Sequence, residues 1–104
     1  MEIQFNTSSN IKGSEELTGP LSEQLTTGLS RFSDQITRLI VHLSDQNGNK
    51  EGNNDQRCML EVRLEGMQPI AVTNDANSKS DAVKGAIDKM KSALEKSIGK
   101  LKTH

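Results

Sequence analysis

Apolar and polar residues alternate with a period of two in four short segments, which is the pattern of half-buried β-strands. The segments are residues 2–7, 36–45, 57–65 and 68–74. Their predicted inward positions are Ile3, Phe5, Leu39, Val41, Leu43, Cys58, Leu60, Val62, Leu64, Ile70 and Val72. Gly66 marks a tight turn between the last two strands, and Pro69 favours the start or the edge of the fourth.

Two other segments repeat apolar residues every three or four positions, which predicts amphipathic helices. The first stripe is Leu17, Leu21, Leu25, Leu29 and Phe32. The second begins at about Ser78 and consists of Val83, Ala86, Ile87, Met90, Leu94, Ile98 and Leu101. The start of the first helix has two solutions. Ser14 can cap it, with a first turn loosened by Pro20, or Thr18 is the cap and Pro20 lies in the first turn.

The resulting order is β-α-β-β-β-α, with a polar hairpin connection at residues 46–56. We therefore expect an α+β two-layer sandwich in which both helices cover one face of a four-stranded sheet. The chain of 104 residues is expected to form a single domain, residues 1–104.

The composition allows a thin core and favours a binding protein over an enzyme. Only 32% of the residues are hydrophobic, with two Phe and no Trp or Tyr, so a cofactor cavity would be hard to support. The single cysteine, Cys58, excludes an intramolecular disulfide. We find no signal-peptide pattern and no apolar run of about 20 residues, and we expect a cytoplasmic protein without membrane contact.

Charge is distributed unevenly along the chain. Residues 1–77 carry six Lys or Arg and eleven Asp or Glu, whereas residues 78–104 carry seven Lys and three acidic residues. The net charges of −5 and +4 give the total of −1. An acidic body with a basic helix indicates an electrostatic role for that helix, and the alternative is an ordinary solvated lysine face.

A helical projection separates the lysines of the second helix into two groups. Lys89, Lys96 and Lys100 fall within about 40° on one flank, with no acidic residue of the helix among them. The opposite flank carries Lys84, Lys91 and Lys102 beside an acidic row, where Lys84–Asp88, Asp88–Lys91 and Lys91–Glu95 pairs are expected. The first group suits an RNA phosphate backbone, although without aromatic residues for base stacking.

The sequence contains no motif of a known catalytic site. His42 and Cys58 lie in neighbouring predicted strands, but no third residue orients them, and they are better explained as a strand histidine and a buried cysteine. Carboxylates lack the spacing of metal ligands. We expect no enzymatic activity, cofactor, metal or small-molecule substrate.

Several segments resemble the short ribosome hibernation promoting factors, a bacterial family of ribosome-associated translation inhibitors. They are Ile3–Phe5, Asn10–Ile11, Glu15–Leu17, Arg31–Ile36, Asp81–Lys91 and Gly99–His104, together with the element order. The resemblance implies a stress factor that binds the small ribosomal subunit near the mRNA and tRNA channel and inhibits translation.

The same resemblance implies basic residues that contact the rRNA backbone. The candidates are Lys89, Lys96, Lys100, Lys79, Lys84 and Arg31. Three positions depart from the family pattern, because Gln24, Thr27 and Ser92 stand where relatives carry basic residues. The alternative is a domain that keeps the fold but has lost ribosome binding and serves protein interaction, with a weak homodimer through the sheet face that carries Met59 as one form.

Overall fold

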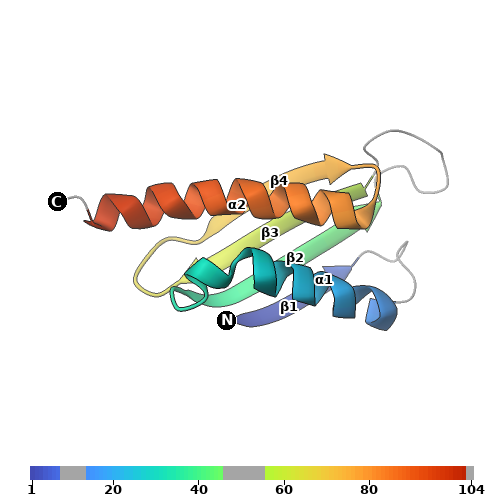
Figure 1. The fold of residues 1–104 in the computed structure, drawn as a ribbon, viewed down its shortest axis with the longest axis horizontal. Coiled ribbons are helices and arrows are strands. Elements are labelled where there is room, and N and C mark those ends of the chain that lie inside the picture. Colours follow the sequence, from blue (N-terminus) through green and yellow to red (C-terminus); the bar gives the residue numbers. More distant parts are fainter. Residues whose placement is uncertain (8–13, 46–55, 103–104) are drawn as a thin grey trace.

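The protein folds into two layers, a four-stranded sheet and two helices that cover one of its faces (Figure 1). The computed structural model describes residues 1–7, 14–45 and 56–102, apart from the side chains of residues 7, 14–18, 45 and 100–102. The elements are β1 (Glu2–Thr7), α1 (Ser14–Gly28), the 3-10 turn η1 (Ser30–Phe32), β2 (Ile36–Asp45), β3 (Gln56–Leu64), β4 (Ile70–Ala76) and α2 (Lys79–Lys102). The predicted order and the α+β class are confirmed.

The sheet has the strand order β1-β2-β3-β4. β1 runs parallel to β2, because α1 crosses over between them, whereas β2, β3 and β4 are antiparallel neighbours. Leu39 lies opposite Ile3 on one side and Val62 on the other, so the apolar positions align on a single face. The predicted alternation in these strands is therefore confirmed.

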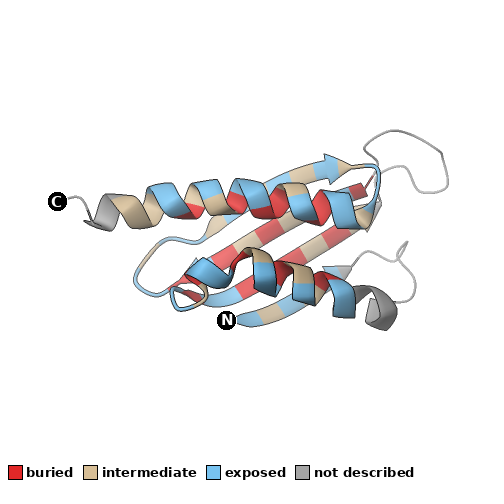
Figure 2. Cartoon of the chain, in the orientation of Figure 1, coloured by how far each residue is buried: buried red, intermediate tan, exposed pale blue. Residues whose placement is uncertain are grey.

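The core lies between the sheet and the helices (Figure 2). It consists of aliphatic side chains from β2, β3, α1 and α2, with Phe32 as its buried aromatic residue. Ile3, Phe5, Ile70 and Val72 on the outer strands are only partly buried and pack against it. Burial of this aliphatic material is the main stabilising term of the fold.

α1 begins at Ser14 and continues through Pro20, which lies inside the helix with an exposed side chain. The alternative with Thr18 as the cap is therefore wrong, although the loss of one amide hydrogen bond at Pro20 remains. Leu21 and Leu25 are buried as predicted, while the side chain of Leu17 lies outside the described residues.

The helix ends earlier than the apolar stripe predicts. Leu29 and Phe32, expected on the same helix, follow its last residue Gly28, and both are buried. A Cβ at Gly28 would lie 2.7 Å from Cγ2 of Ile87, so glycine allows α1 to approach α2 closely.

α2 begins after Ser78, whose hydroxyl oxygen accepts a hydrogen bond from the backbone N–H of Asp81 at 3.1 Å. Its buried side is Ala82, Val83, Ala86, Ile87, Met90 and Leu94, with Ile98 partly buried. Leu101 belongs to the helix, but its side chain lies outside the described residues.

The turn at Gly66 has a φ of 73°, a conformation that favours glycine. Of the predicted hairpin connection, residues 46–56, only Gln56 is described, as the first residue of β3. In the described part of the chain, no helix is both long and apolar enough to cross a membrane.

Candidate nucleic-acid interface

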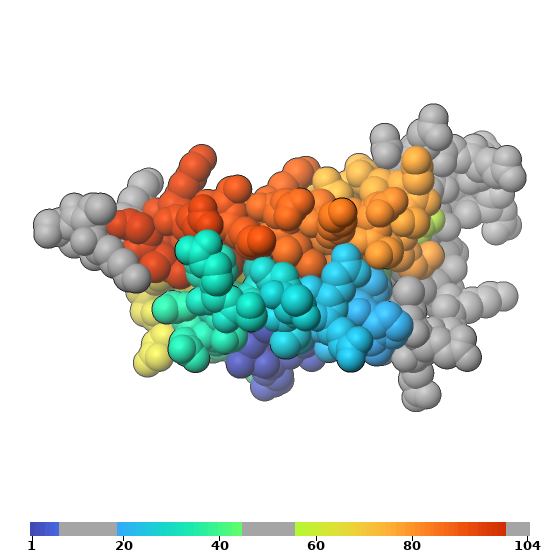
Figure 3. Space-filling view, in the orientation of Figure 1, coloured from blue at the N-terminus to red at the C-terminus, as the bar shows by residue number. Residues whose placement is uncertain are grey.

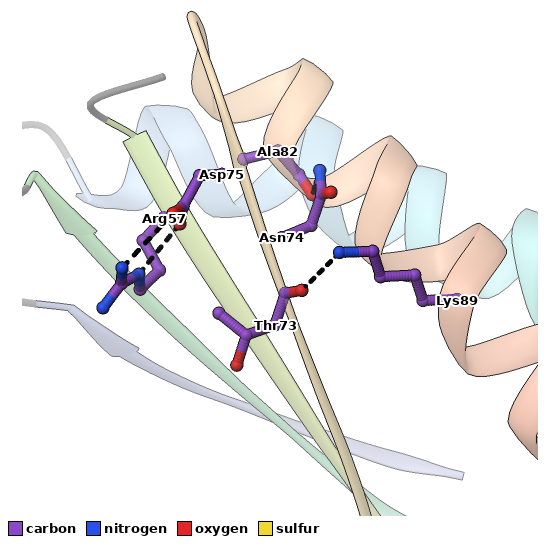
Figure 4. Close-up of polar contacts among 6 residues, drawn as sticks. All are labelled: Arg57, Thr73, Asn74, Asp75, Ala82 and Lys89. Carbon is purple, nitrogen blue, oxygen red and sulfur yellow. Dashed lines mark hydrogen bonds and ion pairs between the residues drawn. The ribbon is translucent and has the colours of Figure 1, made fainter. Parts of the chain in front are cut away.

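The lysines of α2 lie on two sides of the helix, as the helical projection predicts. α2 packs over β3 and β4 and also contacts α1 (Figures 1 and 3). Lys89 reaches the strand, because its Nζ donates a hydrogen bond of 2.8 Å to the backbone carbonyl of Thr73 in β4 (Figure 4). We call the group Lys89, Lys96 and Lys100 the β4-side flank.

The members of the β4-side flank differ in their surroundings. Lys96 follows Lys89 by two helical turns and is exposed, and it has no hydrogen-bond or ion-pair partner among the described residues. Lys100 lies in the same helix, but its side chain is outside the described residues. Lys96 is therefore the member of this flank without a contact among the described residues, whereas Lys89 uses one of its three ammonium donors for Thr73.

Asp75 of β4 pairs with Arg57 and lies near Lys89. The Asp75 carboxylate accepts two hydrogen bonds from Arg57, at 2.8 and 3.2 Å (Figure 4). The bond from Arg57 lowers the pKa of Asp75, and the nearby charge of Lys89 lowers it further by a smaller amount. Within the described residues Lys89 forms no ion pair with Asp75, so the uncompensated stripe expected from the sequence stays a prediction.

The opposite side of α2 faces α1. Lys84 and Lys91 line a groove of about 500 Å³ between the helices, together with Glu23 and Asp88. Its other lining residues are Pro20, Gln24, Thr27, Gly28 and Ile87. With two basic and two acidic side chains, the groove is neutral in sum.

The expected ion pairs within α2 do not form. Within the described residues, Lys84, Asp88 and Lys91 are not joined by ion pairs, and Glu95 pairs with Arg31 instead. The Nη1 of Arg31 lies 3.2 Å from Oε1 of Glu95 and its guanidinium lies 5.3 Å from the centre of the Phe32 ring. The periodicity of one helix could not reveal this pair, because its partners are 64 residues apart.

Three acidic side chains, Asp81, Asp88 and Glu95, follow one another at seven-residue intervals along the outer side of α2. All three are exposed, and we call them the acidic crest. The crest separates the β4-side flank from Lys84 and Lys91. The six predicted RNA-contacting residues are thus not brought together in one patch.

The remaining candidates lie at the two ends of the helix pair. Lys79 is the first residue of α2 and is partly exposed. Arg31 lies in η1, at the C-terminal end of α1. Both can contribute charge only at the ends of a ligand that lies along the helices.

Gln24 has a structural partner that sequence reasoning did not predict. Its Nε2 donates to the backbone carbonyl of Ser80 at 3.2 Å, and the Ser80 hydroxyl donates to Oε1 of Gln24 at 3.4 Å. These two bonds connect α1 to the first turn of α2. Gln24 therefore joins the two helices.

The structure separates His42 from Cys58. Cys58 lies opposite Leu43 and faces the core, whereas His42 lies opposite Met59 on the face of the sheet that α1 and α2 leave uncovered. Burial raises the pKa of the Cys58 thiol to about 12, which keeps it protonated and unreactive at neutral pH. A cysteine–histidine pair is excluded, and the described residues contain no group of side chains suited to hold a metal ion.

The fold defines a class, a small two-layer β-α-β-β-β-α domain with both helices on one face of a four-stranded sheet. Solved structures share this fold, among them the following two. The N-terminal domain of Thermus thermophilus Protein Y has a TM-score of 0.71 at 18% identity, over 92% of this chain and 98% of that one. A ribosomal subunit interface protein from Coxiella burnetii has a TM-score of 0.70 at 18% identity, over 95% of this chain and 99% of that one.

Residues 6–104 match the family described as sigma 54 modulation protein / S30EA ribosomal protein, and the chain belongs to this family. The predicted relationship to ribosome-associated hibernation proteins is thereby confirmed. No curated protein matches the sequence.

Proposed function

We propose that this protein binds the small ribosomal subunit near the mRNA and tRNA channel and inhibits translation under stress, as a cytoplasmic and non-enzymatic factor. Membership of the S30EA family supports a ribosome-associated role. The proposed inhibition is steric, since a domain in this channel excludes the ligands that translation requires. It needs no cofactor and no catalytic residue.

The observation that carries the proposal is the β4-side flank. Lys89 and Lys96 are separated by seven residues of a single helix, which corresponds to about 10.5 Å. A rigid helix can hold such charges toward a phosphate backbone without ordering a flexible segment, and each contact releases counterions from the RNA. Phe5 and Phe32 are partly and fully buried, so neither offers an exposed ring for stacking. Recognition by charge and shape is therefore favoured.

The acidic crest limits how RNA can approach. A duplex lying directly over α2 would meet Asp81, Asp88 and Glu95, whereas one approaching over the β4 side would meet Lys96 first. Lys84 and Arg31 contribute on the α1 side in this proposal, and Lys79 at the N-terminal end of α2. The β4-side flank is the principal contact because the groove is neutral in sum.

Cosedimentation with purified small ribosomal subunits tests the proposal. We expect the wild-type protein to migrate with the subunit, and Lys96→Glu/Lys100→Glu to remain in the supernatant. This pair leaves the Lys89–Thr73 hydrogen bond intact. If three lysines each neutralise a phosphate, the affinity falls about 20- to 40-fold when the salt concentration rises from about 50 to 200 mM.

The matched control is Arg38→Glu/Arg63→Glu, which reverses two charges on the uncovered face of the sheet. It should bind like the wild type. Binding that is unchanged in the Lys96→Glu/Lys100→Glu variant but lost in Lys84→Glu/Lys91→Glu would move the interface to the groove. Absence of wild-type binding at both salt concentrations would contradict the proposed function.

A second candidate function is a protein-interaction domain without ribosome binding. The observation that favours it is the uncovered sheet face, where Ile40 and Met59 are only partly buried. This candidate predicts a specific protein partner or a weak homodimer. Sedimentation equilibrium at high protein concentration separates the cases, since a monomer there would argue against self-association through this face.

A further inference from the structure

The ion pair between Arg31 and Glu95 connects η1 to the last third of α2. Both side chains are largely exposed, Arg31 at 71% and Glu95 at 53% of their full accessible area. The pair is therefore surrounded by water, and its partners can separate without burying an unpaired charge. It lies beside a hollow of about 230 Å³, lined also by Phe32, Gln35, Ile98 and Gly99.

Arg31 is held in position by two contacts of different kinds. Glu95 accepts a hydrogen bond from Nη1, and the guanidinium also lies near the Phe32 ring. The ring is fixed in the core, because Phe32 is buried. Loss of the Glu95 contact would thus leave the guanidinium close to its present place, with donors free for an oxyanion.

We propose that Glu95 is an intramolecular competitor of RNA phosphate for Arg31, and that this competition lowers the affinity of the protein for RNA. The inference rests on the proposed function, since it assigns a regulating residue to the same interaction. In the free protein, Glu95 neutralises Arg31. In the complex, a phosphate binds the guanidinium of Arg31, and the Glu95 carboxylate is solvated by water.

Replacement of the Glu95 carboxylate by a phosphate costs little and gives Arg31 a stronger contact. An exposed ion pair is weak, whereas a guanidinium can bind a phosphate through two parallel hydrogen bonds. The phosphate can therefore displace the carboxylate, but only with part of the binding free energy that an unpaired arginine would provide. Asp88, two turns earlier on the acidic crest, has no arginine partner in the described residues and cannot act in this way.

The test compares Glu95→Gln with Asp88→Asn, which removes the same charge from the same helix. Binding is measured by fluorescence anisotropy against two probes, purified small ribosomal subunits and a 20-nucleotide oligouridylate. We expect Glu95→Gln to raise the affinity about three- to fivefold, and Asp88→Asn to raise it less than about twofold. In an Arg31→Gln background, Glu95→Gln should give no more gain than Asp88→Asn.

A readout on Arg31 itself distinguishes competition from general repulsion. In the wild type, the side-chain Nε–Hε resonance of Arg31 should shift when oligouridylate is added, and in Glu95→Gln it should shift at lower RNA concentration. Equal gains for the two carboxyl variants, or a gain that persists without Arg31, would overturn the inference. If no variant binds subunits while the oligouridylate results are as expected, the proposed function fails and the competition stands.

Discussion

The buried thiol of Cys58 makes the stability of the fold depend on pH. Its side chain is fully buried beside Leu60 and Val62 in β3, and burial raises the pKa of its thiol from 9.0 to about 12. Between these values the unfolded chain has lost the proton that the folded protein retains. The free energy of unfolding therefore decreases as the pH rises through this interval, by up to about 1.4 kcal/mol per pH unit.

This dependence can be measured against Cys58→Ala, which keeps every lysine that also titrates in the same range. Urea unfolding at about pH 8.5 and pH 10.5 should show the advantage of the wild type over the variant shrinking by about 2 kcal/mol. A constant difference between the two proteins would show that the thiol is more accessible to water than its position indicates.

The environment of individual charged side chains was the least predictable part of the site. The flank shared by Lys89 and Lys96 follows from helical spacing alone and was predicted from the sequence. The contact of Lys89 with Thr73 and its proximity to Asp75 depend on how α2 lies over β4. The same applies to Arg31 and Glu95, which meet only because η1 packs near the C-terminal part of α2.

Helices and strands were predicted well because each has one apolar side. The alternation of apolar and polar residues predicted the ends of β2 and β3 to within one residue. Ser78 correctly indicated the start of α2. Pro20 could not be interpreted from sequence, since its cost to α1 is offset by the burial of Leu21 and Leu25. The Gln24–Ser80 connection required the relative position of two helices, which periodicity does not contain.

The close approach of α1 and α2 at Gly28 yields a prediction for stability. In Gly28→Ala, the new methyl group would meet Ile87 at 2.7 Å, so the helices must separate or Ile87 must change its rotamer. Overpacking of this kind costs about 1–3 kcal/mol, which outweighs the gain of up to about 1 kcal/mol from replacing a helical glycine. We expect a net loss of about 1–2 kcal/mol in urea unfolding.

The matched control is Gly99→Ala in α2, where an added Cβ meets no heavy atom within 4 Å. This variant should be stabilised by about 0.5–1 kcal/mol through helix propensity alone. A Gly28→Ala variant as stable as Gly99→Ala would mean that the contact with Ile87 relaxes at no cost.

In the folded molecule, the acidic and basic residues of α2 form separate rows along the helix. The acidic crest runs along the outside of α2 between two groups of lysines, and the uncovered sheet carries Arg57 paired with Asp75. The helical projection predicted the two groups of lysines, and the structure adds that one lies toward β4 and the other toward α1. RNA is therefore expected to contact the helix layer mainly at the β4-side flank, with Lys84 and Arg31 as secondary contacts on the other side of the acidic crest.

The hydrogen bond from Lys89 to Thr73 has a consequence for solubility. β4 is an outer strand, and the backbone groups that it turns away from β3 could pair with a strand of another molecule. Lys89 occupies one of these carbonyls and places a positive charge beside the strand, so it discourages edge-to-edge aggregation. Lys89→Ala should therefore self-associate at concentrations where Lys96→Ala, with the same loss of charge, stays monomeric in analytical ultracentrifugation. A monomeric Lys89→Ala variant would show that the edge of β4 does not depend on Lys89 for protection against self-association.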